Sequence, residues 1–287
     1  MEMQIHETIE AVRHTLDQGR RKNMVVGFVP TMGALHAGHL SLVTRARQEC
    51  DFVLVSIFVN PLQFGPNEDF DRYHRPFDDD IRRAAGAGVD GVFAPSVDEM
   101  YPEGEPLTRV GVDGLSEPME GAQRPGHFEG VTTVVAKLFH IVGECTAYFG
   151  EKDWQQLAII RQMVTDLCFQ ATIVGCPIVR ESDGLALSSR NANLSPEERR
   201  SALALRRSLD AGVEAVSNGT NDIGEVKKSM IDAMTEDPRV DLQYAEVVDE
   251  HLRVPRTLTG TMRLLVAARI GETRLIDNAS ISVTETR

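Results

Sequence analysis

Residues 24–59 read MVVGFVPTMGALHAGHLSLVTRARQECDFVLVSIFV and contain two apolar runs with a short helical pattern between them. The runs, 24–29 and 52–59, are apolar at both odd and even positions, which is typical of strands buried on both faces. Between them, apolar residues recur at helical spacing and predict a helix over about 39–48. A strand, a helix and a strand joined this closely form a right-handed unit with parallel strands.

The same alternation continues along the chain. Further helices and strands are predicted in turn at 78–87, 91–94, 131–142, 146–149, from 154 onward, and at 171–174. Repeated units of this kind predict an α/β domain with a doubly wound parallel sheet. Such sheets bind ligands beyond the carboxyl ends of their strands. The segments just after Val29, Val59 and Phe149 are therefore the places where a site is expected.

The composition changes towards the C-terminal third. Ser195 followed by Pro196, with Glu198 three residues after the serine, is typical of a helix start with a capping box. Two helices are predicted first, and strands are predicted after them at 243–248, 264–268 and 274–276. We therefore expect a parallel α/β domain over residues 1–185 and a smaller α+β domain over residues 186–287.

The charge and the cysteine pattern exclude several classes of protein. The 287 residues include 43 Asp and Glu against 30 Lys and Arg, which makes the formal net charge −13. A chain this acidic repels nucleic-acid phosphates, and no dense basic block compensates, so we expect no nucleic-acid partner. The cysteines are far apart, which argues against a zinc site and against a disulfide framework. Without a signal peptide or a membrane-spanning stretch, the chain is expected to be cytoplasmic, with no membrane contact.

His36 and His39 lie between the first predicted strand and its helix. Gly33 and Gly38 let the backbone approach a ligand, and a helix N-terminus supplies free N–H groups and a positive dipole. Both imidazoles can donate hydrogen bonds to oxygens that gain charge during transfer at a phosphate. A short H-x-x-H also occurs by chance, and a zinc site would lack a third ligand nearby. The position after the first strand is what favours a nucleotide site.

Amide and charged side chains follow two other strands. Asn60 and Gln63 offer uncharged donors and acceptors, which suit the orientation of a hydroxy acid; the alternative is an ordinary Asn-Pro turn. Further along, Lys152 is placed to meet a phosphate, Asp153 to cap a helix or bind a ribose hydroxyl, and Gln156 to reach a substrate. The alternative for this second block is a charged, solvated helix start.

Two loops are further candidates. In residues 183–190, small hydroxyl side chains precede Arg190, and the segment could close over a triphosphate and neutralise it. Otherwise this segment is an ordinary polar loop. Arg124 and His127 lie in a Gly-rich stretch that could serve as a lid.

With these blocks in this order, the chain resembles the pantothenate synthetase family, the ligases that join pantoate to β-alanine. The resemblance extends from the first strand to residues 274–278 and depends on the blocks 30–39, 58–64, 150–156 and 183–191. It implies a Rossmann-like domain of the HxGH nucleotidyltransferase type. It also implies ATP with Mg²⁺, a pantoyl adenylate intermediate and a homodimer.

The resemblance implies a role for each block. His36, His39 and Lys152 would act in catalysis at the phosphates, with His39 matching the family's proton donor. The ATP site would be lined by Met32, Gly33, Ala34, Leu35, His36, Ala37, Gly38, His39, Gly150, Glu151, Lys152, Asp153, Val179, Leu187, Ser188, Ser189 and Arg190. Pantoate or β-alanine would contact Asn60, Gln63, Arg124 and Gln156, and Asp80 would help to place the metal.

A few positions depart from the family pattern. Ala37 replaces a usually acidic residue, Glu129 stands where Arg is frequent, and Trp154 stands where Phe or Tyr is usual. His74 and Pro76 differ from the Pro and Thr that are common there. None of these changes removes a residue assigned to catalysis, although Glu129 alters the charge balance of the expected lid.

Two other functions are compatible with parts of the pattern. An adenylyltransferase that acts on a phosphate acceptor would leave Asn60, Gln63 and Gln156 without a purpose. A nucleotide-binding sensor without turnover would be expected to have lost a histidine or Lys152, and all are present. The ligase is therefore the function that the sequence favours.

Overall fold

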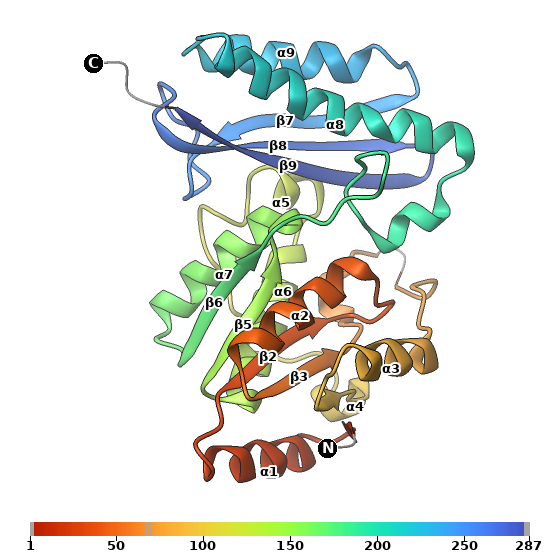
Figure 1. The fold of residues 1–287 in the computed structure, drawn as a ribbon, viewed down its shortest axis with the longest axis vertical. Helices are drawn as coiled ribbons and strands as arrows, with labels where there is room; N and C mark the ends of the chain where they lie inside the picture. The colour runs from red at the N-terminus through yellow and green to blue at the C-terminus, as the bar shows by residue number, and fades with distance from the viewer. Residues whose placement is uncertain (1–2, 67, 69, 284–287) are drawn as a thin grey trace. The chain divides into compact units, whose positions relative to one another are not determined.

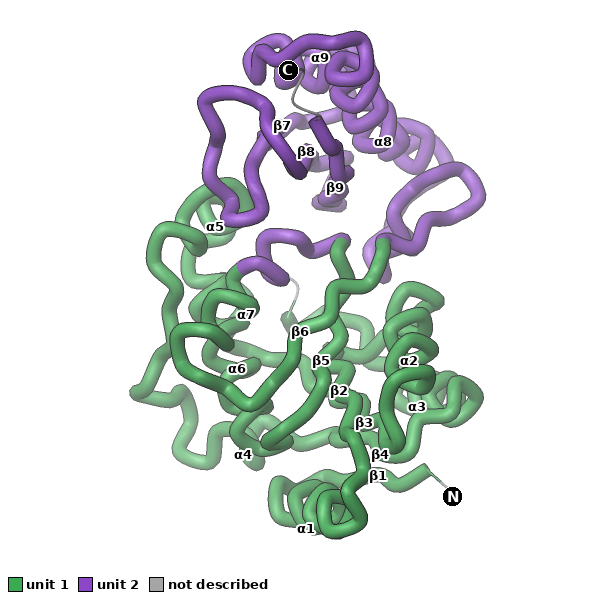
Figure 2. Tube along the Cα trace, turned by 60° about the vertical axis from the view of Figure 1, so that its left-hand side comes forward, with its two compact units in different colours: residues 1–151, 159–177 green, residues 152–158, 178–287 purple. Residues whose placement is uncertain are grey.

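The computed structural model describes residues 3–66, 68 and 70–283. The chain forms two compact units, coloured separately in Figure 2. Residues 1–151 and 159–177 make up the first unit, and residues 152–158 and 178–287 make up the second. Within the described residues, no helix combines the length and the apolar character needed to cross a membrane.

The first unit is built on a six-stranded parallel sheet with the strand order β1-β4-β3-β2-β5-β6 (Figure 2). The strands are β1 (Gln4–His6), β2 (Val26–Thr31), β3 (Phe52–Ile57), β4 (Gly91–Phe93), β5 (Cys145–Gly150) and β6 (Ala171–Cys176). From β2 the chain proceeds outward through β3 and β4, and it then returns to β5 and β6 on the other side. The doubly wound sheet predicted from the sequence is therefore confirmed, and its switch point lies between β2 and β5.

Helices connect these strands. The longer ones are α1 (Ile9–Arg20), α2 (Ala37–Glu49), α3 (Phe77–Gly86), α6 (His127–Val142) and α7 (Trp154–Asp166), and the short ones are α4 (Val97–Met100) and α5 (Glu120–Gln123). Val43 and Ala46 of α2 pack in one core cluster with Val29, Val53 and Val55 of the central strands, all of them at most 1% exposed. The central strands are thus buried, as their uninterrupted apolar runs predict.

The second unit contains a three-stranded antiparallel sheet and two long helices. The strands are β7 (Val240–Val248), β8 (Gly260–Ile270) and β9 (Thr273–Val283), and the helices are α8 (Pro196–Ser217) and α9 (Ile223–Thr235). Figure 1 shows both helices on one face of this sheet, where Leu209, Met230 and Leu264 are completely buried. Ser195 caps α8 and forms a capping box with Glu198, as its sequence predicts.

The second unit begins at Ile178 and also includes residues 152–158, whereas the change in composition suggests a boundary at 185/186. Two contacts explain the earlier start. Arg180 binds Asp277 of β9 through two hydrogen bonds of 2.6 and 3.0 Å, and it forms an isolated β-bridge with Ala186. The contact with Asp277 attaches the segment to the antiparallel sheet, and the bridge to Ala186 closes the loop on itself, before the change in composition becomes visible.

Candidate active site

The histidine pair lies at the switch point of the parallel sheet. β2 ends at Thr31, and α2 begins at Ala37 with His36 as its N-cap residue. The sequence pattern predicts this helix from about residue 39. It begins earlier because a histidine takes the capping position that Ser, Thr, Asp or Asn usually occupies.

The two imidazoles form a reciprocal capping box at the start of α2. His36 Nδ1 accepts the N–H of Gly38 at 3.1 Å, and His39 Nδ1 accepts the N–H of His36 at 3.4 Å. The rings are stacked, with their centroids 4.1 Å apart. A ring nitrogen that accepts a hydrogen bond carries no proton, so each neutral imidazole has its proton on Nε2. The N-terminal end of α2 therefore carries two Nε2–H donors beside the backbone N–H groups of its first turn.

Asp80 holds the loop between β2 and α2. Its carboxylate accepts the N–H of Ala34 at 2.8 Å and the N–H of Leu35 at 2.6 Å, and the residue is 1% exposed. Burial raises the pKa of Asp80, and these two hydrogen bonds oppose the rise. Gly33 has a φ of +84°, and a Cβ added there would lie 2.9 Å from Asp80 Oδ2. Both carboxylate oxygens are thus engaged by the loop that leads to His36.

Asn60 and Gln63 follow the end of β3, where Asn60 is the N-cap of the short 3₁₀ helix η1 (Pro61–Gln63) and Gln63 is its last residue. Gln63 Nε2 is 3.2 Å from the sulfur of Met32, which brings Gln63 beside the histidine loop. The pattern predicts a direct contact between Asn60 and the substrate. In the structure, Asn60 Nδ2 donates to Gln63 Oε1 and to the carbonyl of Gly130, both at 3.1 Å. Both amide hydrogens of Asn60 are therefore directed to protein atoms.

Arg124 is engaged in an ion pair within the protein. Its Nε and Nη2 bind the two carboxylate oxygens of Glu68 at 2.7 and 2.6 Å. Its Nη1 is 3.0 Å from His127 Nε2, and His127 Nδ1 is 2.9 Å from the carbonyl oxygen of Gln63. Burial opposes the ionisation of Glu68, but the hydrogen bonds from Arg124 outweigh it and lower the pKa of Glu68. Much of the positive charge expected to meet a substrate is thus balanced by Glu68.

The pKa of His127 predicts a pH dependence of stability. Burial and the nearby Arg124 lower this pKa from 6.5 to about 4. Such a base stabilises the fold fully above its unfolded-state pKa, and this contribution is lost as the pH falls through the folded-state pKa. We expect the free energy of unfolding to fall by ~2–4 kcal/mol as the pH drops from about 6.5 to below about 4.

His127→Gln is the variant that isolates this contribution. Glutamine does not titrate and keeps a donor for the carbonyl of Gln63, so the variant should lose less stability on acidification. His6, whose pKa is also lowered by burial, contributes equally to both proteins. Urea unfolding at several pH values measures both, and equal slopes against pH would contradict the role given to His127.

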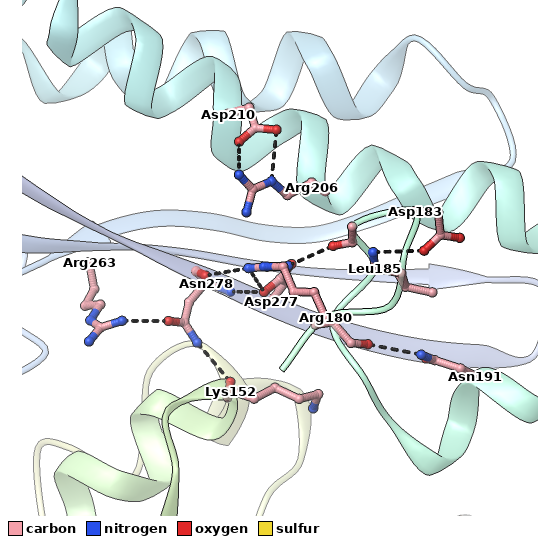
Figure 3. Close-up of polar contacts among 12 residues, drawn as sticks. Lys152, Arg180, Asp183, Leu185, Asn191, Arg206, Asp210, Arg263, Asp277 and Asn278 are labelled. Carbon is pink, nitrogen blue, oxygen red and sulfur yellow. Dashed lines mark hydrogen bonds and ion pairs between the residues drawn. The ribbon is translucent and has the colours of Figure 1, made fainter. Parts of the chain in front are cut away.

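In the second unit, Lys152 opens the segment that leads into α7. Its backbone carbonyl accepts a hydrogen bond of 2.9 Å from Asn278 Nδ2, and Asn278 Oδ1 accepts one of 3.1 Å from Arg263 (Figure 3). Asn278 is 1% exposed. The guanidinium of Arg263 stacks on the ring of Trp154 at 3.7 Å, so the tryptophan noted as unusual has a defined partner. Strand β9 thereby holds the backbone of Lys152.

Residues 178–191 form a folded loop that is attached to the same sheet. Leu187 N–H donates to the carbonyl of Val179 at 3.0 Å, which brings together two residues of the expected ATP site. Ser188 caps the short helix η3 (Ser189–Asn193), and Asn191 Nδ2 binds Glu181 at 2.7 Å. Figure 3 shows the Arg180–Asp277 pair that anchors this loop.

The expected site residues are thus divided between the units. Met32 to His39, Asn60, Gln63, Asp80, Arg124, Gly150 and Glu151 belong to the first, and Lys152, Asp153, Gln156, Val179 and Leu187 to Arg190 belong to the second. Three supporting residues carry no role in the sequence pattern: Glu68, which binds Arg124; Tyr101, whose hydroxyl donates to Asn60 Oδ1; and Asn278, which binds the carbonyl of Lys152. They come from distant parts of the chain, and no local motif connects them to the blocks they support.

A parallel sheet with a helix N-terminus and two Nε2–H donors at its switch point defines an α/β enzyme suited to phosphate-bearing substrates. The chain belongs to the pantoate-beta-alanine ligase family, whose model matches residues 4–280. It is a ligase that joins pantoate to β-alanine and so makes pantothenate, as the sequence predicts.

Individual relatives are similar over nearly the whole chain. A pantothenate synthetase from Moorella thermoacetica is 50% identical over 284 residues, which are 99% of this chain and 100% of the relative. The crystal structure of pantothenate synthetase from Thermus thermophilus is 49% identical, with a TM-score of 0.91 over 96% of this chain and 99% of that one. A Francisella tularensis pantoate-beta-alanine ligase, complexed with beta-gamma ATP and beta-alanine, is 36% identical, with a TM-score of 0.78 over 96% and 97%.

Proposed function

We propose that the chain makes pantothenate through a pantoyl adenylate. In the first step, the carboxylate of (R)-pantoate attacks the α-phosphate of ATP, and pyrophosphate leaves. In the second step, the amine of β-alanine attacks the acyl carbon, and AMP leaves with the bond pair. The observation that carries this proposal is the histidine-capped start of α2, with two Nε2–H donors at the switch point. The Francisella relative, complexed with a form of ATP and β-alanine, supports these two substrates.

The phosphates require neutralisation more than covalent help, because charge spreads over the transferring oxygens. We assign the neutralisation of the phosphate charge to His36 and His39 of the first unit and to Lys152 and Arg190 of the second. The remaining residues of the expected ATP set would bind the nucleotide through backbone and small side chains. These are Met32, Gly33, Ala34, Leu35, Ala37, Gly38, Gly150, Glu151, Asp153, Val179, Leu187, Ser188 and Ser189.

Gln63 and Gln156 are the groups proposed to bind pantoate. Gln63 has its Nε2 against a thioether, which is a weak acceptor that an oxygen of pantoate would replace. Asn60 then acts through Gln63, because its own amide hydrogens are donated to protein atoms. Arg124 acts in the same way, through its contacts with His127 and the backbone of Gln63.

Mg²⁺ enters this proposal only as a companion of the ATP phosphates. The described residues contain no group of three or more His, Cys, Asp or Glu that could hold a metal ion. Asp80, the expected ligand, has both carboxylate oxygens engaged by backbone N–H groups. These residues do not fit a metal held by the protein, and Mg²⁺ often keeps most of its ligands from water and phosphate. A homodimer is also proposed, on the family resemblance alone, and so is a cytoplasmic location, on the cysteine pattern and the lack of a predicted signal peptide or membrane-spanning stretch.

The adenylate route is tested by isotope exchange. The protein is incubated with ATP, Mg²⁺, (R)-pantoate and labelled pyrophosphate, without β-alanine. Because reversal of the first step returns pyrophosphate to ATP, we expect label in ATP only when pantoate is present. If exchange required β-alanine as well, adenylate formation would not be a separate step that precedes the binding of β-alanine. Transfer of AMP to a phosphate acceptor in place of pantoate would instead support the adenylyltransferase.

A further inference from the structure

A buried chain of three side chains ends at Gln63. Tyr101, Asn60 and Gln63 are 5%, 1% and 8% exposed. The hydroxyl of Tyr101, which follows the last residue of α4, donates to Asn60 Oδ1 at 2.9 Å. Asn60 Nδ2 in turn donates to Gln63 Oε1 at 3.1 Å. Tyr101 is thus connected to Gln63, the proposed pantoate-binding residue, through the single side chain of Asn60.

The direction of every bond in this chain follows from one carbonyl. Gly130 O can only accept, and it lies 3.1 Å from Asn60, so the amide nitrogen of Asn60 must face it. The oxygen of Asn60 then faces Tyr101, whose hydroxyl must be the donor. Burial raises the pKa of Tyr101, which keeps that hydroxyl protonated. The second hydrogen of Asn60 is directed to Gln63, which must present its oxygen in return.

As a result, the side-chain nitrogen of Gln63 is directed away from Asn60. Nε2 lies 3.2 Å from the sulfur of Met32, in the loop that leads to the histidines. An amide presented this way donates to the carboxylate or hydroxyl oxygens of a hydroxy acid. The opposite orientation would place an acceptor against a carboxylate and repel it.

We propose that Tyr101 is a positioning residue of the pantoate site, where it sets, through Asn60, the amide orientation with which Gln63 receives the acid. This inference rests on the proposed role of Gln63. The ring of Tyr101 is held between Phe58, with centroids 6.1 Å apart, and the ammonium of Lys137, 5.2 Å from its centroid. These contacts hold the ring of Tyr101 in place, so its hydroxyl has a fixed position from which to orient Asn60.

The close packing of Gly130 against η1 supports the same series of hydrogen bonds from Tyr101 to Gln63. A Cβ added at Gly130 would lie 2.2 Å from the carbonyl oxygen of Leu62 and 2.6 Å from the nitrogen of Gln63. Helix α6 thus approaches the backbone of η1 more closely than any side chain would allow. The backbone of Gln63 is fixed from this side, and Asn60 and Tyr101 fix its amide.

The test compares Tyr101→Phe, Gln63→Ala and the double variant with the native protein. For Tyr101→Phe we expect the KM for pantoate to rise about three- to tenfold, since a buried acceptor loses its donor. The KM values for ATP and β-alanine should change less than about twofold. In the Gln63→Ala background, loss of the hydroxyl should have no further effect on the KM for pantoate, because both changes act on one contact.

Tyr148→Phe is the matched control. Tyr148 is also buried, and its hydroxyl donates to Glu49 at 2.9 Å in the same unit. Its loss should leave the KM for pantoate unchanged, and thermal unfolding shows whether each variant is folded. If Gln63→Ala raises the KM for pantoate but Tyr101→Phe does not, the positioning role is wrong while the role of Gln63 stands. If Gln63→Ala has no effect on that KM, the role of Gln63 fails, and the role of Tyr101 fails with it.

Discussion

We expect the His39→Ala variant to form the pantoyl adenylate about 10²- to 10³-fold more slowly than the native protein, the usual cost of losing one oriented donor to developing charge. His39 Nδ1 accepts a backbone N–H, so the imidazole presents Nε2–H at the start of α2. If His39 binds the phosphates as proposed, alanine removes this donor from oxygens that gain charge in the reaction. Pyrophosphate release in a single turnover with saturating ATP and pantoate measures the step directly.

The capping bond of His39 complicates this variant, because its loss also weakens the start of α2. His39→Gln separates the two effects, since its side-chain oxygen can still accept the N–H of His36 in a capping box. This variant should regain stability but not the native rate. His14→Ala, on the exposed face of α1, is the control for an unrelated histidine. A His39→Ala rate within about threefold of the native rate would exclude the catalytic role.

The parallel sheet was predictable because its strands are long apolar runs with turn residues between them. β2 and β3 are buried on both faces, so their sequences lack the alternation that would suggest an exposed surface. β1 is different. It has only three residues, two of them exposed, and it pairs with β4, which follows far later in the chain. No local pattern predicts a strand that exists only because a distant partner completes it.

The candidate site likewise contains residues that the sequence predicts and residues that it does not. The blocks with His36, Gln63 and Lys152 follow strand ends, and topology brings the first two together at one edge of the sheet. The residues that hold these blocks were not predictable from local sequence. Asn278 lies in the middle of β9, and its bond to the carbonyl of Lys152 joins positions that are 126 residues apart. Every residue has a backbone carbonyl, and nearly every residue has a backbone N–H. The side chains that form hydrogen bonds to particular backbone groups therefore cannot be recognised from residue type alone.

Asp80 illustrates this most clearly, since the family resemblance implies that this residue, the last of three consecutive aspartates, helps to place the metal. In the structure, this carboxylate is buried and binds the N–H groups of Ala34 and Leu35. We expect Asp80→Ala to lower the free energy of unfolding by ~2–5 kcal/mol, because two N–H groups lose their acceptor. We also expect kcat to fall about 10²-fold, because a displaced loop misplaces His36 and His39. Asp78→Ala, on the exposed side of the same turn, should change neither quantity appreciably.

A titration with Mg²⁺ distinguishes loop support from metal binding. Asp80→Asn keeps one acceptor oxygen and the size of the side chain, so it should retain part of the native activity. If Asp80 only supports the loop, excess Mg²⁺ leaves the kcat of this variant unchanged, because the displaced histidines do not respond to the ion. If Asp80 held the metal, the variant would regain activity as the Mg²⁺ concentration rises, since mass action compensates for a weakened site. The two engaged oxygens and the left-handed turn at Gly33 lead us to expect no recovery.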